Sequence, residues 1–332
     1  MRRVRFAPSP TGSLHVGNAL SAVANRRLGD WMLLRVDDTD AARNVAGGEL
    51  AILADLEWLG VRWEEGPVRQ SERASRHREV GEQLGARFDG VTLLRDDGTP
   101  TYHLASVVDD IDFGITHVVR GNDHRPNEPL HRRLFEALGV LPPEFVHHGL
   151  ILGADGKKLA KRAPGATVAS LREVGVPAEA VRAYLDELGI PKHDVRLDLP
   201  RIRRLAVEAI ASLSDDELAA RVGAPVALVP ALRGARDLNE ARDYTTAILA
   251  PPRDKVSLDE RGKLTLARFK ELLEAPNGNI DARALVREVK AVGGDLRALR
   301  VALTGRERGP ELWSVIAALP RDELVRRIDA AL

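Results

Sequence analysis

The chain has 332 residues, of which 44% are hydrophobic and 30% charged, a composition typical of a globular protein with about two domains. Its 49 Lys and Arg residues balance 49 Asp and Glu residues, so bulk charge gives no support for a wide nucleic-acid-binding face, although it does not exclude a local basic stripe. The sequence has no cysteine, which excludes disulfide bonds and thiolate zinc sites. It begins without the apolar stretch of a signal peptide and has no run of membrane-spanning length, so we expect a cytoplasmic protein that does not enter membranes.

The first element is a short apolar run at residues 4–7, followed by the loop at 8–13 and then by small apolar and polar residues at helical spacing. This pattern predicts a strand, a tight loop and a helix. His15 and Gly17 fall in the first helical turn, where unpaired N–H groups and the helix dipole favour an anion. An imidazole there can bind phosphate, and a glycine lets a ligand approach the backbone. A single histidine at such a place is more often a cap or a surface residue, so this pattern is weak alone.

A strand predicted at residues 31–36 ends in the acidic loop 37–40, and open α/β sheets bind ligands at the carboxyl ends of their strands. Acidic loops also serve simply as helix caps, which is the competing interpretation. Residues 48–59 follow with helical spacing. We expect the apolar side of this helix to carry Leu50, Leu53, Ala54 and Leu56, and the polar side Glu49, Asp55 and Glu57.

Further helices are predicted at 71–86 and 127–138, and strands at 115–120 and 145–152. Arg120, at the end of the first of these strands, could pair with a carboxylate in a bidentate fork or equally form a surface salt bridge. His147 and His148 lie within the second strand, so we expect core or edge positions rather than metal ligation. The alternation of strands and helices to residue 152 indicates a parallel, doubly wound sheet, and the chain from residue 163 onward has helical spacing.

A basic loop at residues 153–162, GADGKKLAKR, carries three lysines and an arginine in six residues. By itself such a run is most often a solvated loop. Ammonium groups of this kind neutralise the β- and γ-phosphates of a nucleotide, and both Lys158 and Lys161 are available for that role. The loop and the His15 helix are joined into one ATP site only by the family resemblance that follows.

The segments SPTGSLHVGN, RVDDTD, GTPTYHLASVVDD, GITHVVRGNDH and GKKLAKR occur in this order and resemble one family, the glutamyl-tRNA synthetases of class I. The first segment resembles the HIGH motif of the class and the last its KMSKS motif. The likeness covers about half of the chain and returns more weakly at the carboxyl end. It implies a class I Rossmann-like α/β catalytic domain in residues 1–165 and an all-α domain in 166–332, formed by a helical stem and an anticodon-binding-like region.

The resemblance implies an ATP-dependent ligase of protein biosynthesis that activates L-glutamate as an adenylate and transfers it to tRNA, in the first place tRNA-Glu. Mg²⁺ would come with the nucleotide, held by phosphate oxygens; no zinc and no metal-binding residue are expected. The implied catalytic residues are His15, Lys158 and Lys161. The implied ATP-binding residues are His15, Gly17, Asn18, Arg43, Asp123, Lys158 and Lys161. The implied amino-acid-binding residues are Arg5, Ser9, Asp37, Tyr102, Ser106 and Arg120.

The sequence departs from the family pattern in the pocket and in one missing segment. Asp37 stands where the family has Glu, at a position associated with the substrate amino group, and Ser106 and Asn122 also differ from the pattern. The long insertion that holds the acceptor end of tRNA in the family is missing near residues 87–91.

These departures leave three hypotheses open. The first is a compact glutamate–tRNA ligase. The second is a paralogue that activates glutamate or a related amino acid for an acceptor other than tRNA. The third is a catalytically silent binding or regulatory protein, which the retained His15, Gly17, Lys158 and Lys161 make the least favoured.

Overall fold

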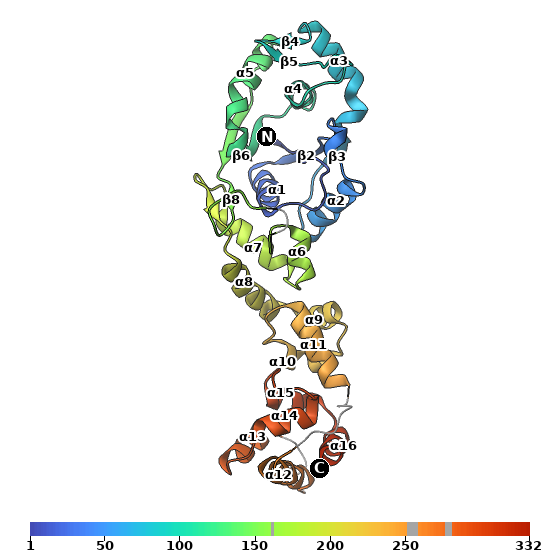
Figure 1. Cartoon of the computed structure of the whole chain (residues 1–332), viewed down its shortest axis with the longest axis vertical. Coiled ribbons are helices and arrows are strands. Elements are labelled where there is room, and N and C mark those ends of the chain that lie inside the picture. The colour runs from blue at the N-terminus through green and yellow to red at the C-terminus, as the bar shows by residue number, and fades with distance from the viewer. Residues whose placement is uncertain (161–162, 251–257, 276–280) are drawn as a thin grey trace. The chain divides into compact units, whose positions relative to one another are not determined.

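The computed structural model describes residues 1–160, 163–250, 258–275 and 281–332 (Figure 1). The chain folds into two compact units. The first consists of Met1–Glu173 and Val181–Ile202, and the second of Val174–Ala180 and Arg203–Leu332. The domain boundary expected after residue 165 stays a prediction.

The first unit is built on parallel strands. Three of them form one sheet in the order β1 (Arg3–Phe6), β2 (Trp31–Val36) and β3 (Glu65–Arg69). A second parallel pair consists of β6 (His117–Gly121) and β7 (Glu144–His148). The amide of Thr116 donates to the carbonyl of Arg3 at 2.9 Å, which brings β6 alongside β1. The predicted parallel α/β fold, in two halves, is thus confirmed.

Helices connect the parallel strands (Figure 1). They are α1 (Val16–Leu28) between β1 and β2, α2 (Gly48–Trp58) between β2 and β3, α3 (Ala74–Gln83) and α4 (Tyr102–Asp112) before β6, and α5 (Glu128–Ala137) between β6 and β7. The buried side of α1 includes Val16, Ala19, Leu20 and Val23, which recur at the spacing of one helix face. Short 3-10 helices at Ala41–Arg43, Gln70–Arg73 and Asn122–Asn127 precede α2, α3 and α5. The helices predicted at 48–59, 71–86 and 127–138 are confirmed, the second with a later start.

The strand predicted at 145–152 is broken in two. Gly149 donates its amide to the carbonyl of Pro191 at 2.7 Å, so β7 ends at His148. The chain then forms β8 (Ile151–Leu152), which pairs in parallel with β9 (Val195–Arg196). A single apolar run gave no sign of this interruption, because the partner of Gly149 lies far along the chain.

The prediction for the faces of α2 is wrong at three positions. Asp55 is fully buried, whereas Leu50 is 72% exposed and Ala54 is exposed as well. The buried carboxylate of Asp55 accepts hydrogen bonds from Ser13 Oγ at 2.6 Å and from the Leu14 amide at 2.8 Å. Because these donors come from the loop before α1, helical periodicity in α2 could not predict that Asp55 would face inward.

A short β-hairpin with a two-residue turn lies at the position where the sequence lacks the acceptor-binding insertion of the family. β4 (Arg87–Phe88) pairs in antiparallel fashion with β5 (Val91–Thr92). The connecting residues, Asp89 and Gly90, have φ angles of 50° and 78°. Positive φ at both positions of a two-residue turn matches the twist of a hairpin, and Asp-Gly is among the pairs that adopt it most readily. The chain therefore closes locally between α3 and α4.

The second unit is helical. The helices that lead into it are α6 (Val168–Glu173), α7 (Ala178–Leu188) and α8 (Leu199–Ser212). Its own helices are α9 (Asp215–Val222), α10 (Val229–Leu232), α11 (Leu238–Leu249), α12 (Glu260–Glu274), α13 (Ala282–Ala291), α14 (Leu296–Thr304), α15 (Leu312–Ala318) and α16 (Arg321–Ala331), and a 3-10 helix at Val226–Leu228 precedes α10.

Short polar side chains mark where these helices begin. The residue before α9, α11, α12, α13 or α14 accepts a hydrogen bond from a backbone N–H of the first turn; these residues are Ser214, Asp237, Asp259, Asp281 and Asp295. Such N-caps satisfy N–H groups that have no partner inside the helix. Gly223 and Gly305 follow α9 and α14 with φ near 70°, a conformation that favours glycine at the end of a helix.

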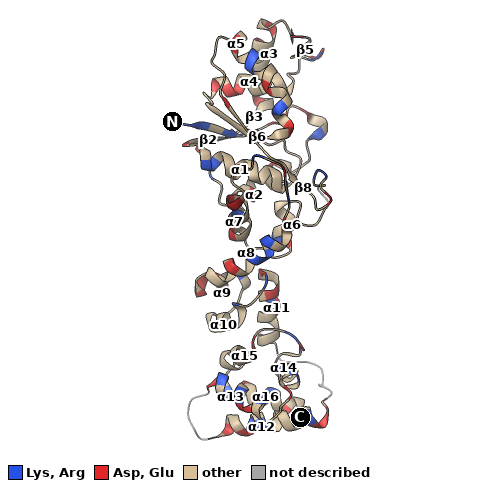
Figure 2. Cartoon of the chain, turned by 90° about the vertical axis from the view of Figure 1, so that its left-hand side faces the viewer, with Lys and Arg blue, Asp and Glu red and all other residues tan. Residues whose placement is uncertain are grey.

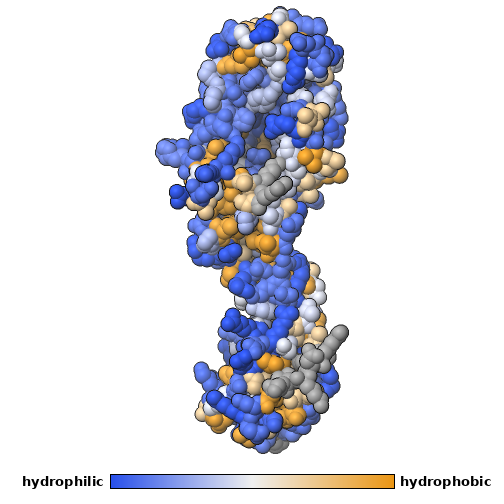
Figure 3. Space-filling model, in the orientation of Figure 1, coloured by the Kyte–Doolittle hydropathy of each residue, from blue (hydrophilic) through white to orange (hydrophobic). Residues whose placement is uncertain are grey.

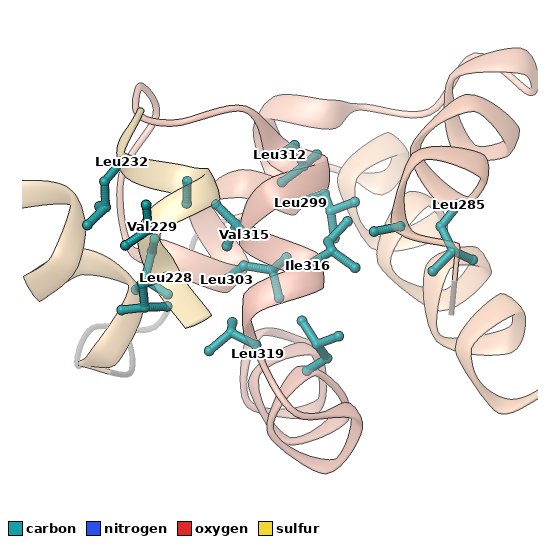
Figure 4. Packing of buried hydrophobic residues seen from close by; sticks show 14 of the residues in the cluster. Leu228, Val229, Leu232, Leu285, Leu299, Leu303, Leu312, Val315, Ile316 and Leu319 are labelled. Carbon is teal, nitrogen blue, oxygen red and sulfur yellow. The ribbon is translucent and has the colours of Figure 1, made fainter. Parts of the chain in front are cut away.

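Aliphatic side chains fill the core of the second unit. Leu228, Val229 and Leu232 belong to one buried cluster with Leu303 of α14 and Val315 of α15, all labelled in Figure 4. On the molecular face of Figure 3 hydrophilic residues predominate and apolar ones form scattered patches. Within the described ranges, no helix combines the length and the apolarity needed to span a membrane.

Candidate active site

His15 lies at the start of α1 and contacts the basic loop. It is the N-cap residue, and its Nδ1 accepts a hydrogen bond from the Gly17 amide at 3.4 Å. Its Nε2 lies 2.9 Å from the carbonyl of Leu159. Since a carbonyl only accepts, Nε2 carries the proton, which leaves Nδ1 as the acceptor that Gly17 requires. The structure thus places the imidazole against the residue next to Lys158, over a separation of 144 positions.

Backbone hydrogen bonds hold the two segments together beyond the imidazole. The amide of Val16 donates to Ala166 at 2.9 Å, and that of Val168 donates to Leu14 at the same distance. The segment that follows the basic loop therefore runs beside the loop that carries His15. The structure therefore brings the His15 helix to Leu159, the neighbour of Lys158, whereas Lys161 lies outside the described residues. That Lys158 shares a nucleotide site with His15 stays a prediction.

Lys158 is exposed and accessible to an anion. Its side chain is 77% exposed, and Nζ lies 3.2 Å from Oδ2 of Asp123 in the 3-10 helix after β6. An exposed pair of this kind contributes at most about 1 kcal/mol, so either partner is readily released to a ligand. Asp123 was expected at the ATP site, and the structure brings it to Lys158.

The positions of Gly17, Asn18 and Arg43 neither support nor oppose a role in nucleotide binding. Gly17 and Asn18 lie in the first turn of α1, with Asn18 exposed. Arg43 ends the 3-10 helix before α2 and is exposed. In the part of the chain that the structure describes, no hydrogen bond joins the Arg43 side chain to another residue of the predicted site, so its role stays a prediction.

A buried charge network underlies the predicted amino-acid pocket. Arg35 donates to Asp37 through Nε at 2.7 Å and through Nη2 at 3.2 Å, and Nη1 donates to Asp110 at 2.9 Å. Arg5 reaches the other oxygen of Asp110 at 3.3 Å. Nε of Arg35 also lies 3.7 Å from Asp109. Two of the residues expected to bind the amino acid, Arg5 and Asp37, are thus held by one set of ion pairs.

Burial and neighbouring charges shift the ionisation of this network. Burial alone would lower the pKa of Arg35, but the carboxylates around it raise that pKa well above its usual value. Burial raises the pKa of Asp37, although Arg35 opposes the change. Burial would raise the pKa of Asp109, but a hydrogen bond from His77 and the charge of Arg35 lower this pKa to about 2. Arg35 and Asp109 are therefore charged at neutral pH.

Sequence reasoning missed Arg35, Asp109 and Asp110. The signal was present, because Arg35 is the one charged residue in the strand WMLLRV and the two aspartates interrupt an apolar helical stretch. A charged residue in such surroundings is normally buried only when it is paired. What the sequence did not indicate was which partners it would find.

Arg120 lies at the end of β6 among histidines. Its Nε donates to Nε2 of His147 at 3.2 Å, and Nη1 lies 3.5 Å from Nδ1 of His131. His131 in turn lies 3.1 Å from His103, so the imidazoles continue away from the guanidinium. Nη2 of Arg120 is buried and has no hydrogen-bond partner. Arg120 was open to interpretation as a surface salt bridge, and that interpretation is wrong because the residue is buried.

The other expected pocket residues lie on α4 and in the loop after β1. Tyr102 opens α4, and its hydroxyl lies 3.3 Å from Nδ1 of His124. Ser106 is buried and accepts from Arg35 at 3.5 Å. Ser9 is half-buried, and its carbonyl accepts from the Thr11 amide at 2.8 Å. His148 is buried and lies 2.7 Å from Ser21 Oγ, which confirms the core position expected for it.

The chemistry of these groups suits anions, and the substrates that they bind stay a prediction. A helix start and a lysine suit phosphates, and two buried guanidinium groups suit a carboxylate. Among the described residues, no group of three or more His, Asp or Glu is arranged to hold a metal ion.

Comparison with known protein families identifies the two types of domain in the chain. The family model "tRNA synthetases class I (E and Q), catalytic domain" matches residues 1–87 and 85–199, two segments that meet at the hairpin formed by β4 and β5. The model "Anticodon binding domain" matches residues 254–332. The expected domain types are therefore present in the expected order.

Relatives and solved structures match over nearly the whole chain. A protein named glutamate–tRNA ligase 1 from Rubrobacter xylanophilus is 35% identical over 423 aligned positions, which include 99% of this chain and 97% of the relative. The corresponding ligase from Akkermansia muciniphila is 33% identical, over 98% of each chain. Because 423 positions exceed the 332 residues of this chain, the relative carries segments that this chain lacks.

The fold comparison agrees. A crystal structure of a glutamate tRNA ligase from Elizabethkingia meningosepticum, in complex with its amino acid, has a TM-score of 0.78 at 23% identity and covers 99% of both chains. The chain belongs to the glutamate–tRNA ligase family of class I tRNA synthetases.

Proposed function

We propose that this protein is a glutamate–tRNA ligase, which joins L-glutamate to AMP at the expense of ATP and then transfers the glutamyl group to tRNA. The observation that carries the proposal is the hydrogen bond between His15 and the carbonyl of Leu159, because it joins the phosphate-binding start of α1 to the lysine loop. The relatives that match over nearly the whole chain bear the same name. ATP, tRNA and protein biosynthesis fit a cytoplasmic location.

The nucleotide is bound by the helix start and by the lysine loop. His15 and Gly17 present the first turn of α1, and Lys158 supplies a mobile ammonium group beside it. Lys161 would add a second ammonium group. Gly17, Asn18, Arg43 and Asp123 complete the proposed ATP site. Mg²⁺, carried by phosphate oxygens, would neutralise part of the charge on the triphosphate.

Activation requires no general base. The α-carboxylate of glutamate is ionised at neutral pH, and one of its oxygens attacks the α-phosphorus while the bond to the β-phosphate breaks and pyrophosphate leaves. The protein must hold the two reactants in line and stabilise the charge that builds up on the phosphates. His15, Lys158 and Lys161 would supply that stabilisation. In the second step a tRNA hydroxyl attacks the carbonyl carbon and AMP leaves.

The amino acid would bind over the buried charge network. Arg5 and Arg120 are the guanidinium groups at the pocket, with Tyr102 near Arg120. Asp37, Ser9 and Ser106 would complete the amino-acid site. Asp37 is fixed by Arg35, so its place is set before the substrate arrives.

The tRNA would be recognised by both units, without a wide basic surface. In Figure 2 basic and acidic segments are both scattered over the helices of the second unit, and the whole chain has zero net charge. The short hairpin of β4 and β5 stands where the family carries its acceptor-binding segment, which supports a reduced contact with the acceptor end.

The test is ATP–pyrophosphate exchange with a panel of amino acids, each measured with and without tRNA. We expect exchange with L-glutamate that depends on tRNA, followed by charging of tRNA-Glu. Exchange without tRNA and without charging would instead support a paralogue that serves another acceptor. Complete absence of exchange and charging would refute both.

Lysines of the same loop provide both the test variants and their matched control. Lys158→Ala should slow exchange by about tenfold or more, because an ammonium group on the phosphates is lost. Lys157→Ala, at the exposed neighbouring position, should leave the rate nearly unchanged. Lys161→Ala should slow adenylate formation and leave amino-acid binding largely intact.

A further inference from the structure

Two buried arginines of the first unit have opposite surroundings. Arg35 is enclosed by carboxylates, with Asp37 at 2.7 Å and Asp110 at 2.9 Å. Arg120 is buried to a similar degree, at 5% exposure. Among the described residues, however, no carboxylate lies within 4.0 Å of the Arg120 guanidinium. Two imidazole nitrogens accept hydrogen bonds from it, and the Tyr102 side chain is the other hydrogen-bonding group beside it. Arg35 thus forms direct ion pairs inside the protein, whereas the described residues offer Arg120 none and Asp110 acts on it only from a greater distance.

The imidazoles around Arg120 act as neutral acceptors. A guanidinium group only donates, so Nε2 of His147 and Nδ1 of His131 must both be unprotonated. Each ring then carries its proton on the other nitrogen. In His147 that nitrogen, Nδ1, lies 3.4 Å from Oε2 of Glu128, and in His131 it faces His103 at 3.1 Å. Glu128 and His103 thus hold the two rings through their protonated nitrogens, and the unprotonated nitrogens point at Arg120.

The charges around the cluster favour this neutral state. Burial and the charge of Arg120 lower the pKa of His131 to about 2 and that of His147 to about 4. Glu128 acts in the opposite direction on His147, but its carboxylate is also paired with Arg132 at 2.6 Å. At neutral pH the cluster therefore adds no charge that could balance or repel Arg120.

Burial makes the uncompensated charge costly. Desolvation lowers the pKa of Arg120, which means that the site disfavours the charged form. Nη2 is buried without a partner, so one donor of the guanidinium remains unused. Buried polar groups are nearly always hydrogen-bonded, and a buried charge is normally paired. An anion that binds at Nη2 would supply both the hydrogen bond and the balancing charge.

We propose that His147 and His131 are positioning residues that give the pocket its preference for an acid over the matching amide, because they hold Arg120 through neutral nitrogens and leave its charge and its Nη2 group for a carboxylate of the substrate. This inference rests on the proposed function, in which Arg120 belongs to the amino-acid site. It goes further by assigning the selectivity to the neutrality of residues that do not touch the substrate. If a carboxylate stood in place of either imidazole, Arg120 would be balanced from within, as Arg35 is.

The test compares two substitutions that differ only in charge. In His147→Gln the amide oxygen takes the place of Nε2 and remains neutral, whereas His147→Glu puts a carboxylate of the same shape there. Binding of L-glutamate, L-glutamine and ATP to the full chain is measured by calorimetry. We expect the Gln variant to keep the wild-type preference for L-glutamate. In the Glu variant the affinity for L-glutamate should fall by about tenfold or more, because a charge-assisted hydrogen bond is lost, with little change for L-glutamine.

A second pair covers the case in which position 147 does not tolerate substitution. In His131→Asn the amide oxygen takes the place of Nδ1, and His131→Asp adds the charge there. Thermal unfolding of all four variants shows whether each is folded. The same ratio of glutamate to glutamine affinity in the neutral and the charged member of both pairs would overturn the inference. So would a loss of affinity for ATP instead of L-glutamate, since the anion at Arg120 would then be a phosphate.

The test of amino-acid selectivity and the test of ligase activity can fail independently. A wild-type protein that prefers L-glutamate in calorimetry but neither supports pyrophosphate exchange nor charges tRNA would refute the ligase and leave the selectivity inference standing. An active ligase whose neutral and charged variants have equal selectivity would refute the inference alone.

Discussion

Replacement of Asp55 by alanine should destabilise the first unit and disturb the loop that carries His15. The Asp55 carboxylate is fully buried and accepts from Ser13 Oγ at 2.6 Å and from the Leu14 amide at 2.8 Å. Its other oxygen accepts from Arg172 of α6 at 3.3 Å. One side chain of α2 therefore holds the start of α1 and contacts the segment after the lysine loop.

The magnitude follows from what each partner loses. A hydrogen bond to a charged group contributes about 1.5–3 kcal/mol, and a buried donor left without an acceptor costs about 1–3 kcal/mol. Arg172 is 40% exposed and can hydrogen-bond to water in the variant, so the loss of its ion pair with Asp55 costs little free energy. The Leu14 amide and the Ser13 hydroxyl are less accessible to solvent. We therefore expect Asp55→Ala to lower the free energy of unfolding of the first unit by about 3–5 kcal/mol.

The assay is urea unfolding at pH 7 followed by tryptophan fluorescence. Trp31, Trp58 and Trp63 lie in the first unit, so the signal reports mainly on it. The matched control is Glu57→Ala, since Glu57 is an exposed acid on the same helix. If Asp55→Ala stays within about 1 kcal/mol of Glu57→Ala, the buried carboxylate does not hold the loop and the reasoning is refuted.

Three further predictions concern buried charge and helix capping. Arg35→Met should lower the free energy of unfolding by about 3–5 kcal/mol, because it leaves buried carboxylates unpaired; no change in urea unfolding would contradict this. The pKa of Asp109 is about 2, below its usual 3.8, so it stabilises the fold above pH 3.8, and that contribution of about 2 kcal/mol should disappear as the pH falls towards 2. Urea unfolding of wild type and Asp109→Asn at both ends of that range checks it, since their difference should shrink in acid. Ser214→Ala removes the N-cap that accepts from Glu217, and hydrogen exchange in α9 should report a local loss of about 1 kcal/mol.

Much of the fold could be predicted because its signals are local. The alternation of apolar strands and helices up to residue 152 predicted the parallel α/β unit, and the N-caps Ser214, Asp259 and Asp295 lie where helical spacing begins in the second unit. Each of these signals lies within a few residues of the element that it predicts. The hairpin turn at 89–90, by contrast, was not predicted, although Asp-Gly is a pair that favours such a turn.

The candidate site was predictable as a set of residues but not as a set of contacts. His15 and Lys158 could be paired only through a resemblance in motif order, and the structure joins them by a hydrogen bond to Leu159. Asp55 was placed on the wrong face, because its partners Ser13 and Leu14 precede it by about forty positions.

The sequence by itself determined the family, the order of the domains and the types of side chain that we propose for the nucleotide and amino-acid sites. Only the tertiary structure decided which of the buried charges are balanced. Arg35 and Arg120 both occur in apolar strands, and only Asp37, two residues after Arg35, is a partner close in sequence. The fold brings aspartates of α4 to Arg35 and imidazoles to Arg120. Charge compensation depends on distances across the core, which hydrophobic periodicity along one strand does not encode.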